Sequence, residues 1–217
     1  MPWFSKSRLS GVEKDAAVDV IRHLQTMLAY QQLTMERTND AFALAAGTTT
    51  PTHEGFVRPQ ALLRDPDAVV RYMIPALQVK REVLAAMEEK HRTFPKPTSK
   101  PVKTAYDEFT SLLAAMQQRA TFQYESYVAW TEDPSLEVRP MLLDPVEDSA
   151  LNKLLRTLNG VIEKVGMRVN EEPWLEIVCQ AFNSVRADVG LPPFSGSDFR
   201  SRYFAGLTGQ PARFFRD

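Results

Sequence analysis

The sequence is poor in several features, and each scarcity excludes a class of protein. Its 217 residues include one cysteine, Cys179, which excludes an internal disulfide framework and an all-cysteine metal site. Glycine is limited to 9 residues, and neither GxxxxGKS/T nor GxGxxG is present to cradle a phosphate. No apolar run approaches the roughly 20 residues of a membrane-spanning helix. We therefore expect a cytoplasmic protein that holds no cofactor and no metal.

Neither sign of charge is in excess. The chain has 26 Lys and Arg residues against 27 Asp and Glu residues, which gives a net charge of −1. So balanced a chain has no overall field that draws it to DNA or to an anionic membrane, and such binding would need a local patch. The hydrophobic content of 44% is typical of a globular domain.

What the sequence does contain is a series of long segments in which apolar residues recur every three or four positions. This is the period of an α-helix with one buried face. Residues 10–47 predict a first helix about 50 Å long. Further helices are predicted over 65–94, 104–133, 144–169, 170–190 and 197–207. Within the second of them, Pro75 predicts a kink or a restart of the helix.

Polar residues interrupt the apolar faces at a few positions. The seam of the first helix is predicted to be Ile21, Leu24, Leu28, Gln31, Met35, Thr38, Phe42 and Ala45. Gln31 and Thr38 in this seam, and Gln123 in the third helix, either lie at its solvated edge or hydrogen-bond to one another across helices.

The fold class that follows is all-α. We expect four long helices in an antiparallel-type bundle, a C-terminal helical pair, and short amphipathic arms at both ends. The boundaries are an N-terminal arm over 1–9, the bundle over 10–190, and a short helix with an aromatic and basic C-terminal arm over 191–217. Strand-like alternation is limited to a short piece near Phe56.

Catalytic and metal-binding patterns are weak, and no catalytic residue is predicted. Glu88 and His91 share a helix face, as in the Glu-x-x-His motif of di-iron bundles, but this motif occurs once. We interpret it as a surface pair near a helix end. His53 and Glu54 are the one acid–base couple in a loop, and they fit a polar loop equally well. Cys179 is predicted to be a buried, inert thiol.

Both ends of the chain combine aromatic with basic residues, and a basic connector precedes the third helix. Apolar tails left in water are an aggregation liability, so these ends should dock on their own bundle or on another molecule. The candidate interaction residues are Trp3, Phe4, Lys96, Lys100, Lys103, Arg200, Arg202, Tyr203, Phe204, Arg213, Phe214, Phe215 and Arg216.

These features predict a non-catalytic structural or interaction subunit that self-associates, or docks into a larger assembly, through its long helices and terminal arms. Its partner would be a second copy or another protein. The first alternative is a nucleic-acid-binding or packaging protein that uses the basic connector and the C-terminal arm. A lesser alternative is weak peripheral membrane association through the aromatic ends. An enzyme built in the bundle core is the fourth hypothesis.

Overall fold

The computed structural model describes residues 11–45, 67, 69–136, 145–209 and 212–215. Within these ranges every regular element is a helix, as predicted. The helices are α1 (Gly11–Ala45), the π-helical turn η2 (Val69–Met73), α4 (Ile74–Thr93), α5 (Lys100–Glu132), α6 (Pro145–Val165), α7 (Glu172–Asp188) and α8 (Gly196–Leu207). The strand-like piece near Phe56 lies outside the described residues.

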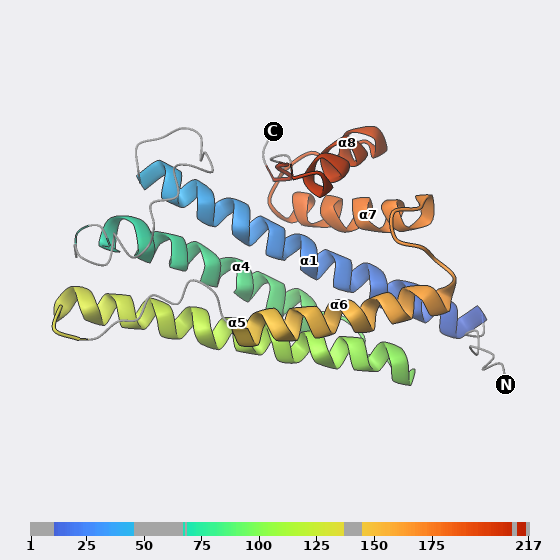
Figure 1. The fold of residues 1–217 in the computed structure, drawn as a ribbon, viewed down its shortest axis with the longest axis horizontal. Helices are drawn as coiled ribbons and strands as arrows, with labels where there is room; N and C mark the ends of the chain where they lie inside the picture. The colour runs from blue at the N-terminus through green and yellow to red at the C-terminus, as the bar shows by residue number, and fades with distance from the viewer. Residues whose placement is uncertain (1–10, 46–66, 68, 137–144, 210–211, 216–217) are drawn as a thin grey trace.

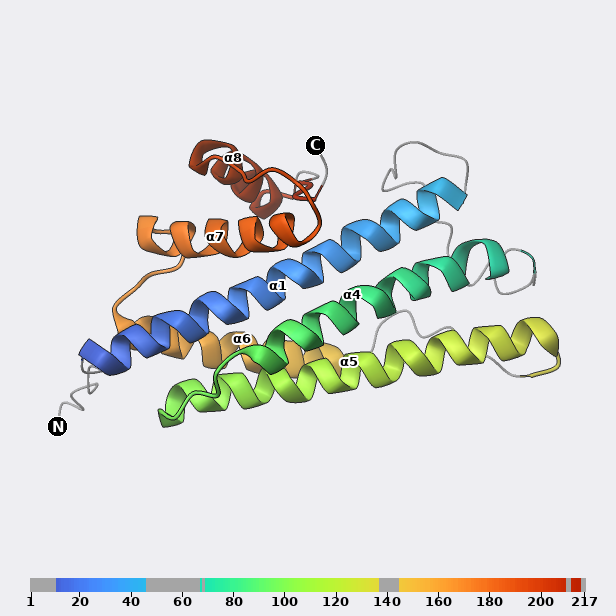
Figure 2. The same cartoon turned by 180° about the vertical axis from the view of Figure 1, so that it is seen from behind.

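Four of these helices form an antiparallel bundle. The chain runs in alternating directions through α1, α4, α5 and α6, and each of these helices packs against its neighbours in the ring (Figure 1). The view from behind shows α4 lying between α1 and α5 (Figure 2). Helix α7 packs on the opposite side of α1, and α8 packs on α7. The predicted bundle with a C-terminal helical pair is therefore confirmed.

Prolines mark where two of the helices begin. Pro75 lies in the first turn of α4, after the π-helical turn, so the predicted restart is correct. Pro101 likewise lies in the first turn of α5, which begins at Lys100 and not at the predicted Thr104. The missing proline N–H costs nothing in the first turn of a helix, where it would have no intrahelical partner. Lys100 and Lys103 thus belong to a helix and not to the extended connector.

The end of α6 also differs from the prediction. The helix stops at Val165, because Gly166 adopts a left-handed conformation with φ of 79°. Val169, which was predicted to continue the buried face, is exposed as a result. Asn170 has φ of 69°, and α7 begins after it at Glu172.

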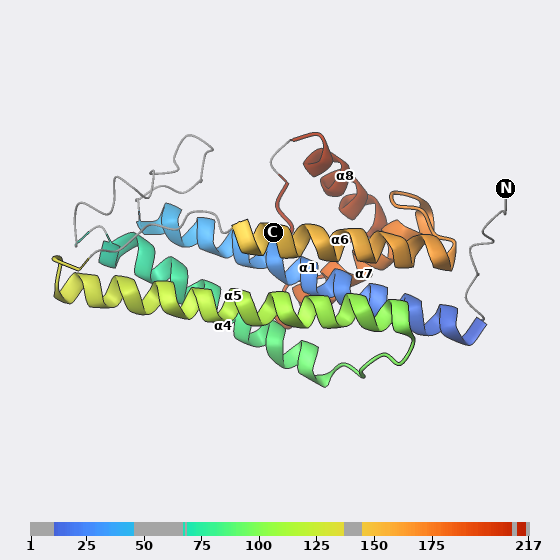
Figure 3. The same ribbon diagram turned by 60° about the horizontal axis from the view of Figure 1, so that its bottom comes forward.

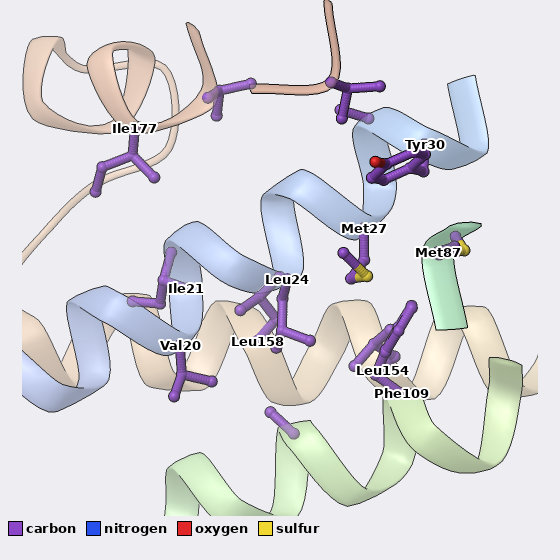
Figure 4. Packing of buried hydrophobic residues seen from close by; sticks show 14 of the residues in the cluster. Val20, Ile21, Leu24, Met27, Tyr30, Met87, Phe109, Leu154, Leu158 and Ile177 are labelled. Atoms are coloured by element: carbon purple, nitrogen blue, oxygen red, sulfur yellow. The ribbon is translucent and has the colours of Figure 1, made fainter. Parts of the chain in front are cut away.

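Helix α1 is enclosed on almost every side. Between Val20 and Glu36 only Arg22 and Met35 are exposed. Leu24 and Met27 pack toward the bundle, and Ile21 lies toward Ile177 of α7 (Figure 4). Phe199, Phe214 and Phe215, from beyond α7, belong to the same hydrophobic core. The residues after 191 therefore share the core of the bundle.

This enclosure corrects the predicted seam of α1. Met35 was placed in the seam but is exposed, whereas Met27, Tyr30 and Leu33 are buried. Gln31 and Gln123 are both half-buried. A single heptad seam describes contact with one neighbour, and α1 has neighbours on two opposite sides.

Helix α6 covers only part of the bundle. It has 21 residues against 33 in α5, and the C-terminal part of α5 extends past it (Figure 3). This stretch has a small hydrophobic cluster of its own, built from Leu77, Tyr127 and Trp130. We call this part of the molecule the open end. It is formed by the last third of α1, by η2, by the start of α4 and by α5 from Phe122 to Glu132.

Candidate functional site

The C-terminal tail is docked on its own chain. Glu36 of α1 is only 6% exposed, and its carboxylate faces the C-terminal tail. The backbone N–H groups of Phe214 and Phe215 donate to its two oxygens at 2.9 and 3.0 Å. Gln32, one turn earlier, donates to the same carboxylate at 2.9 Å. A charged acceptor with three donors makes the strong class of hydrogen bond in a buried setting.

A buried arginine holds the other side of the tail. Arg186 of α7 is 3% exposed and donates to the backbone oxygens of Phe214 at 2.5 Å and Pro192 at 2.6 Å. Its guanidinium carbon also lies 4.0 Å from the ring centroid of Phe194. One planar side chain thus ties α7 to the tail and to the loop before α8. A guanidinium suits this position because its donors point in fixed directions.

Most of the candidate interaction residues in the C-terminal arm are used within the chain. Phe214 and Phe215 are buried. Arg213 pairs with Asp40 at 2.8 Å, and Arg202 donates to the backbone oxygen of Arg213. Arg200 likewise pairs with Glu172, and Tyr203 hydrogen-bonds to Asn170, although these two contacts are exposed. Phe204 stays exposed, while Trp3, Phe4 and Arg216 lie outside the described residues.

The basic connector is partly neutralised by nearby acids. Lys103 pairs with Asp107 one turn later on α5. Lys90 contacts Asp188, which also accepts the hydroxyl of Tyr30 at 2.5 Å. Burial, together with that hydrogen bond to Asp188, raises the pKa of Tyr30. Lys96 and Lys100 remain exposed. Asp188, through its contacts with Tyr30 and Lys90, therefore joins α1, α4 and α7 instead of leaving Lys90 free for phosphate.

Two histidines meet in the bundle core. Nε2 of His23 on α1 lies 2.8 Å from Nδ1 of His91 on α4, and both residues are buried. Nε2 of His91 lies 2.8 Å from the hydroxyl of Thr110 on α5. That hydroxyl donates to the backbone oxygen of Tyr106 at 3.0 Å, so it accepts from His91. It follows that Nδ1 of His91 carries no proton and that His23 donates to it through Nε2.

The environment keeps both imidazoles neutral. Burial, then the neighbouring His91 and the positive charge of Lys90, lowers the pKa of His23 to about 3. Burial lowers the pKa of His91 as well. A proton on His91 would place two N–H groups face to face and break the bond to His23. The pair is therefore a structural hydrogen bond and a poor general base at neutral pH.

One prediction from the sequence is corrected here. Glu88 and His91 do not form a surface pair: Glu88 is exposed and accepts from Gln117 at 2.6 Å, while His91 enters the core. Residues three apart on a helix differ by about 60° in direction, which is enough to place one in water and the other in the core. The couple of His53 and Glu54 lies outside the described residues.

Cys179 is half-buried on α7, where Asn183 lies 3.7 Å from its sulfur. Burial raises the pKa of its thiol. The thiol form, which is the weaker nucleophile, is thereby favoured, in keeping with the predicted inert role.

The groups that organise this site carried no clear signal in the sequence. Glu36 and Arg186 are charged residues whose burial depends on contacts with the tail. The tail is more than 150 residues away from Glu36 in the sequence. Only their placement beside Leu33 and Val185, on otherwise buried faces, hinted at burial. Among the described residues, no three His, Cys, Asp or Glu side chains are grouped to hold a metal ion. Each helix in the described ranges is too short or too polar to cross a lipid bilayer.

Comparison with known proteins finds no relative of this chain. No family model, no curated protein and no solved structure matches this chain.

The carboxylate of Glu36 should hold the tail in place. In the wild type the donors share the two oxygens of the carboxylate, and Glu36→Gln leaves them one acceptor oxygen. A lost hydrogen bond to a charged group costs about 1.5–3 kcal/mol. We expect the Phe214 and Phe215 amides to exchange with solvent at least about tenfold faster in native-state hydrogen exchange. Glu89→Gln, at an exposed pair with Arg92, is the control and should leave both rates unchanged. Equal rates in all three proteins would show that the tail is held by other contacts.

The histidine pair predicts an acid-sensitive fold. Below about pH 6.5 the unfolded chain binds protons at His23 and the folded chain does not, so the free energy of unfolding falls as pH falls. For His23 this amounts to about 2 kcal/mol between pH 6.5 and 5. Urea unfolding at pH 7.5, 6 and 5 measures the slope. His23→Gln should have a shallower slope than the wild type, and an unchanged slope would contradict a neutral buried His23.

Proposed function

We propose that this protein is a non-catalytic interaction subunit that pairs with a second copy of itself through the open end of its bundle. The supporting observation is the exposed Phe122, whose aromatic side chain is 60% exposed on α5, in the stretch past α6. A large exposed apolar side chain on a helix face often marks a contact with another molecule when others lie near it.

Further apolar side chains accompany Phe122. Met35 lies in the last third of α1, Val70 in η2 and Leu136 just after α5, and each is about half exposed. Because neighbouring helices run antiparallel, these positions lie toward the same end of the bundle (Figure 1). Exposed apolar side chains on several elements at one end of the bundle suit a protein partner better than a small ligand.

The charges at the open end favour a second copy as the partner. Arg37, Arg71, Glu125 and Glu132 are exposed on elements that form the open end. An end that carries both bases and acids can give each copy both halves of a complementary pattern, as a two-fold interface requires. A symmetric pairing would also cover the part of α5 that extends past α6.

The nucleic-acid alternative has weaker support. Within the described residues, the arginines of the C-terminal arm are held by Glu172, Asp40 and backbone oxygens, and Lys103 is paired with Asp107. Phosphate would have to displace these partners before it gained a contact. The membrane alternative depends on Trp3 and Phe4, which lie outside the described residues.

Light scattering after size-exclusion chromatography tests the proposal over a range of protein concentrations. The wild type should elute with twice the 24.6 kDa mass of the chain. Phe122→Glu should raise the dissociation constant at least about tenfold, because it places a charge in the centre of the interface. Phe204→Glu, an exposed aromatic of α8, is the matched control and should leave the dimer intact.

Three results would contradict the proposal. They are a monomeric wild type at high micromolar concentration, a dimer that survives Phe122→Glu, and a dimer lost in Phe204→Glu alone. The last result would assign self-association to the C-terminal region instead.

A further inference from the structure

A small cavity lies inside the bundle, in the part where α6 covers the other helices. Its volume is about 60 Å³, and α1, α4, α5 and α6 all contribute side chains to its wall. Five of the residues that line it are no more than 4% exposed: Met27, Met87, Phe109, Leu112 and Met116. The cavity is therefore part of the hydrophobic core and does not belong to the open end.

The remaining lining residues indicate on which side the cavity lies nearest to solvent. Leu28 and Gln31 of α1 and Leu151 of α6 are half-buried. A molecule that comes from solvent meets these side chains before it meets the buried ones. The entrance to the cavity is therefore expected between α1 and α6.

The chemistry of the wall suits an apolar molecule better than water. Among the described residues that line the cavity, Gln31 is the only one with a polar side chain. A buried water molecule normally has about two to four hydrogen-bond partners, and apolar cavities in proteins stay dry. An apolar molecule needs no such partner, and it restores the dispersion contacts that the atoms around an empty cavity lack.

The buried part of the wall is rich in methionine. Met27 comes from α1, Met87 from α4 and Met116 from α5, and Figure 4 shows the first two together with Phe109. Methionine has an unbranched, flexible side chain with a polarizable thioether. These side chains can therefore adjust to the shape of a bound molecule while the helices stay in place.

The volume of the cavity limits the size of its occupant. An engineered apolar cavity of about 150 Å³ holds benzene or xenon. The cavity in this bundle has about 60 Å³, less than half of that volume. The occupant should therefore be smaller than benzene.

We propose that this cavity is a binding site for small apolar molecules, for which xenon and cyclopropane are suitable probes. The bound molecule packs against the three methionines and Phe109, and it enters between α1 and α6. This site is a further function of the chain. It does not depend on dimer formation, because its wall includes α6 and the open end lies past α6.

Methionine methyl NMR of the full chain tests the proposal. Protein labelled with ¹³C in its methionine methyl groups is titrated with xenon under pressure and, separately, with cyclopropane. The methyl resonances of Met27, Met87 and Met116 should shift and reach a plateau, as expected for a site that fills. Met35 lies on the same helix as Met27 but is 52% exposed, so its resonance is an internal control and should show no plateau.

One substitution at two positions of α6 locates the site. Leu151→Phe adds volume in the wall of the cavity and should abolish the saturable shifts. Leu155→Phe is the matched control, because Leu155 is one turn later on the same helix, is 37% exposed and is not part of the wall. This variant should keep the shifts of the wild type.

Several outcomes would overturn the proposal. In the wild type these are the absence of shifts at the three buried methionines, shifts that rise linearly without a plateau, or the same saturable shift at Met35. Saturable shifts that persist in Leu151→Phe, or that vanish equally in Leu155→Phe, would also contradict it. If Leu151→Phe fails to fold, the comparison of the buried methionines with Met35 in the wild type decides the question alone.

Discussion

The enclosure of α1 is the constraint on which the rest of the structure depends. From Val20 to Glu36 this helix is covered by the bundle on one side and by α7 and the tail on the other. A helix with this much burial cannot leave its polar side chains to water. Unpaired buried polar groups would cost on the order of 1–3 kcal/mol each, so each one needs a partner inside the protein.

The partners of these side chains explain why distant parts of the chain are brought together. His23 meets His91, which positions α4 and through Thr110 also α5. Tyr30 meets Asp188 and brings in α7. Glu36 holds the backbone of the tail. Because the tail is engaged within the chain, the surface proposed for a partner moves from the C-terminal arm to the open end.

The fold could be predicted from the sequence to a large extent, and the site could not. The apolar period predicted the helix α5, in which Phe109, Leu113 and Met116 are buried, and Pro75 predicted the restart of α4. These signals are local. The burial of Glu36, Arg186 and His91 depends on groups that approach only after the helices pack, so periodicity could not reveal it. Met35 was misplaced for the same reason, since one heptad seam cannot describe a helix with two buried sides.

The most direct test of this account compares the full chain with a chain that ends at Thr208, by urea unfolding under identical conditions. If the tail is part of the core around α1, its removal exposes the sites of Phe214 and Phe215 and leaves Glu36 without its backbone donors. The account predicts a loss of about 3 kcal/mol or more in the free energy of unfolding. Coincident unfolding curves would show that α1 is enclosed without the tail, and would contradict it.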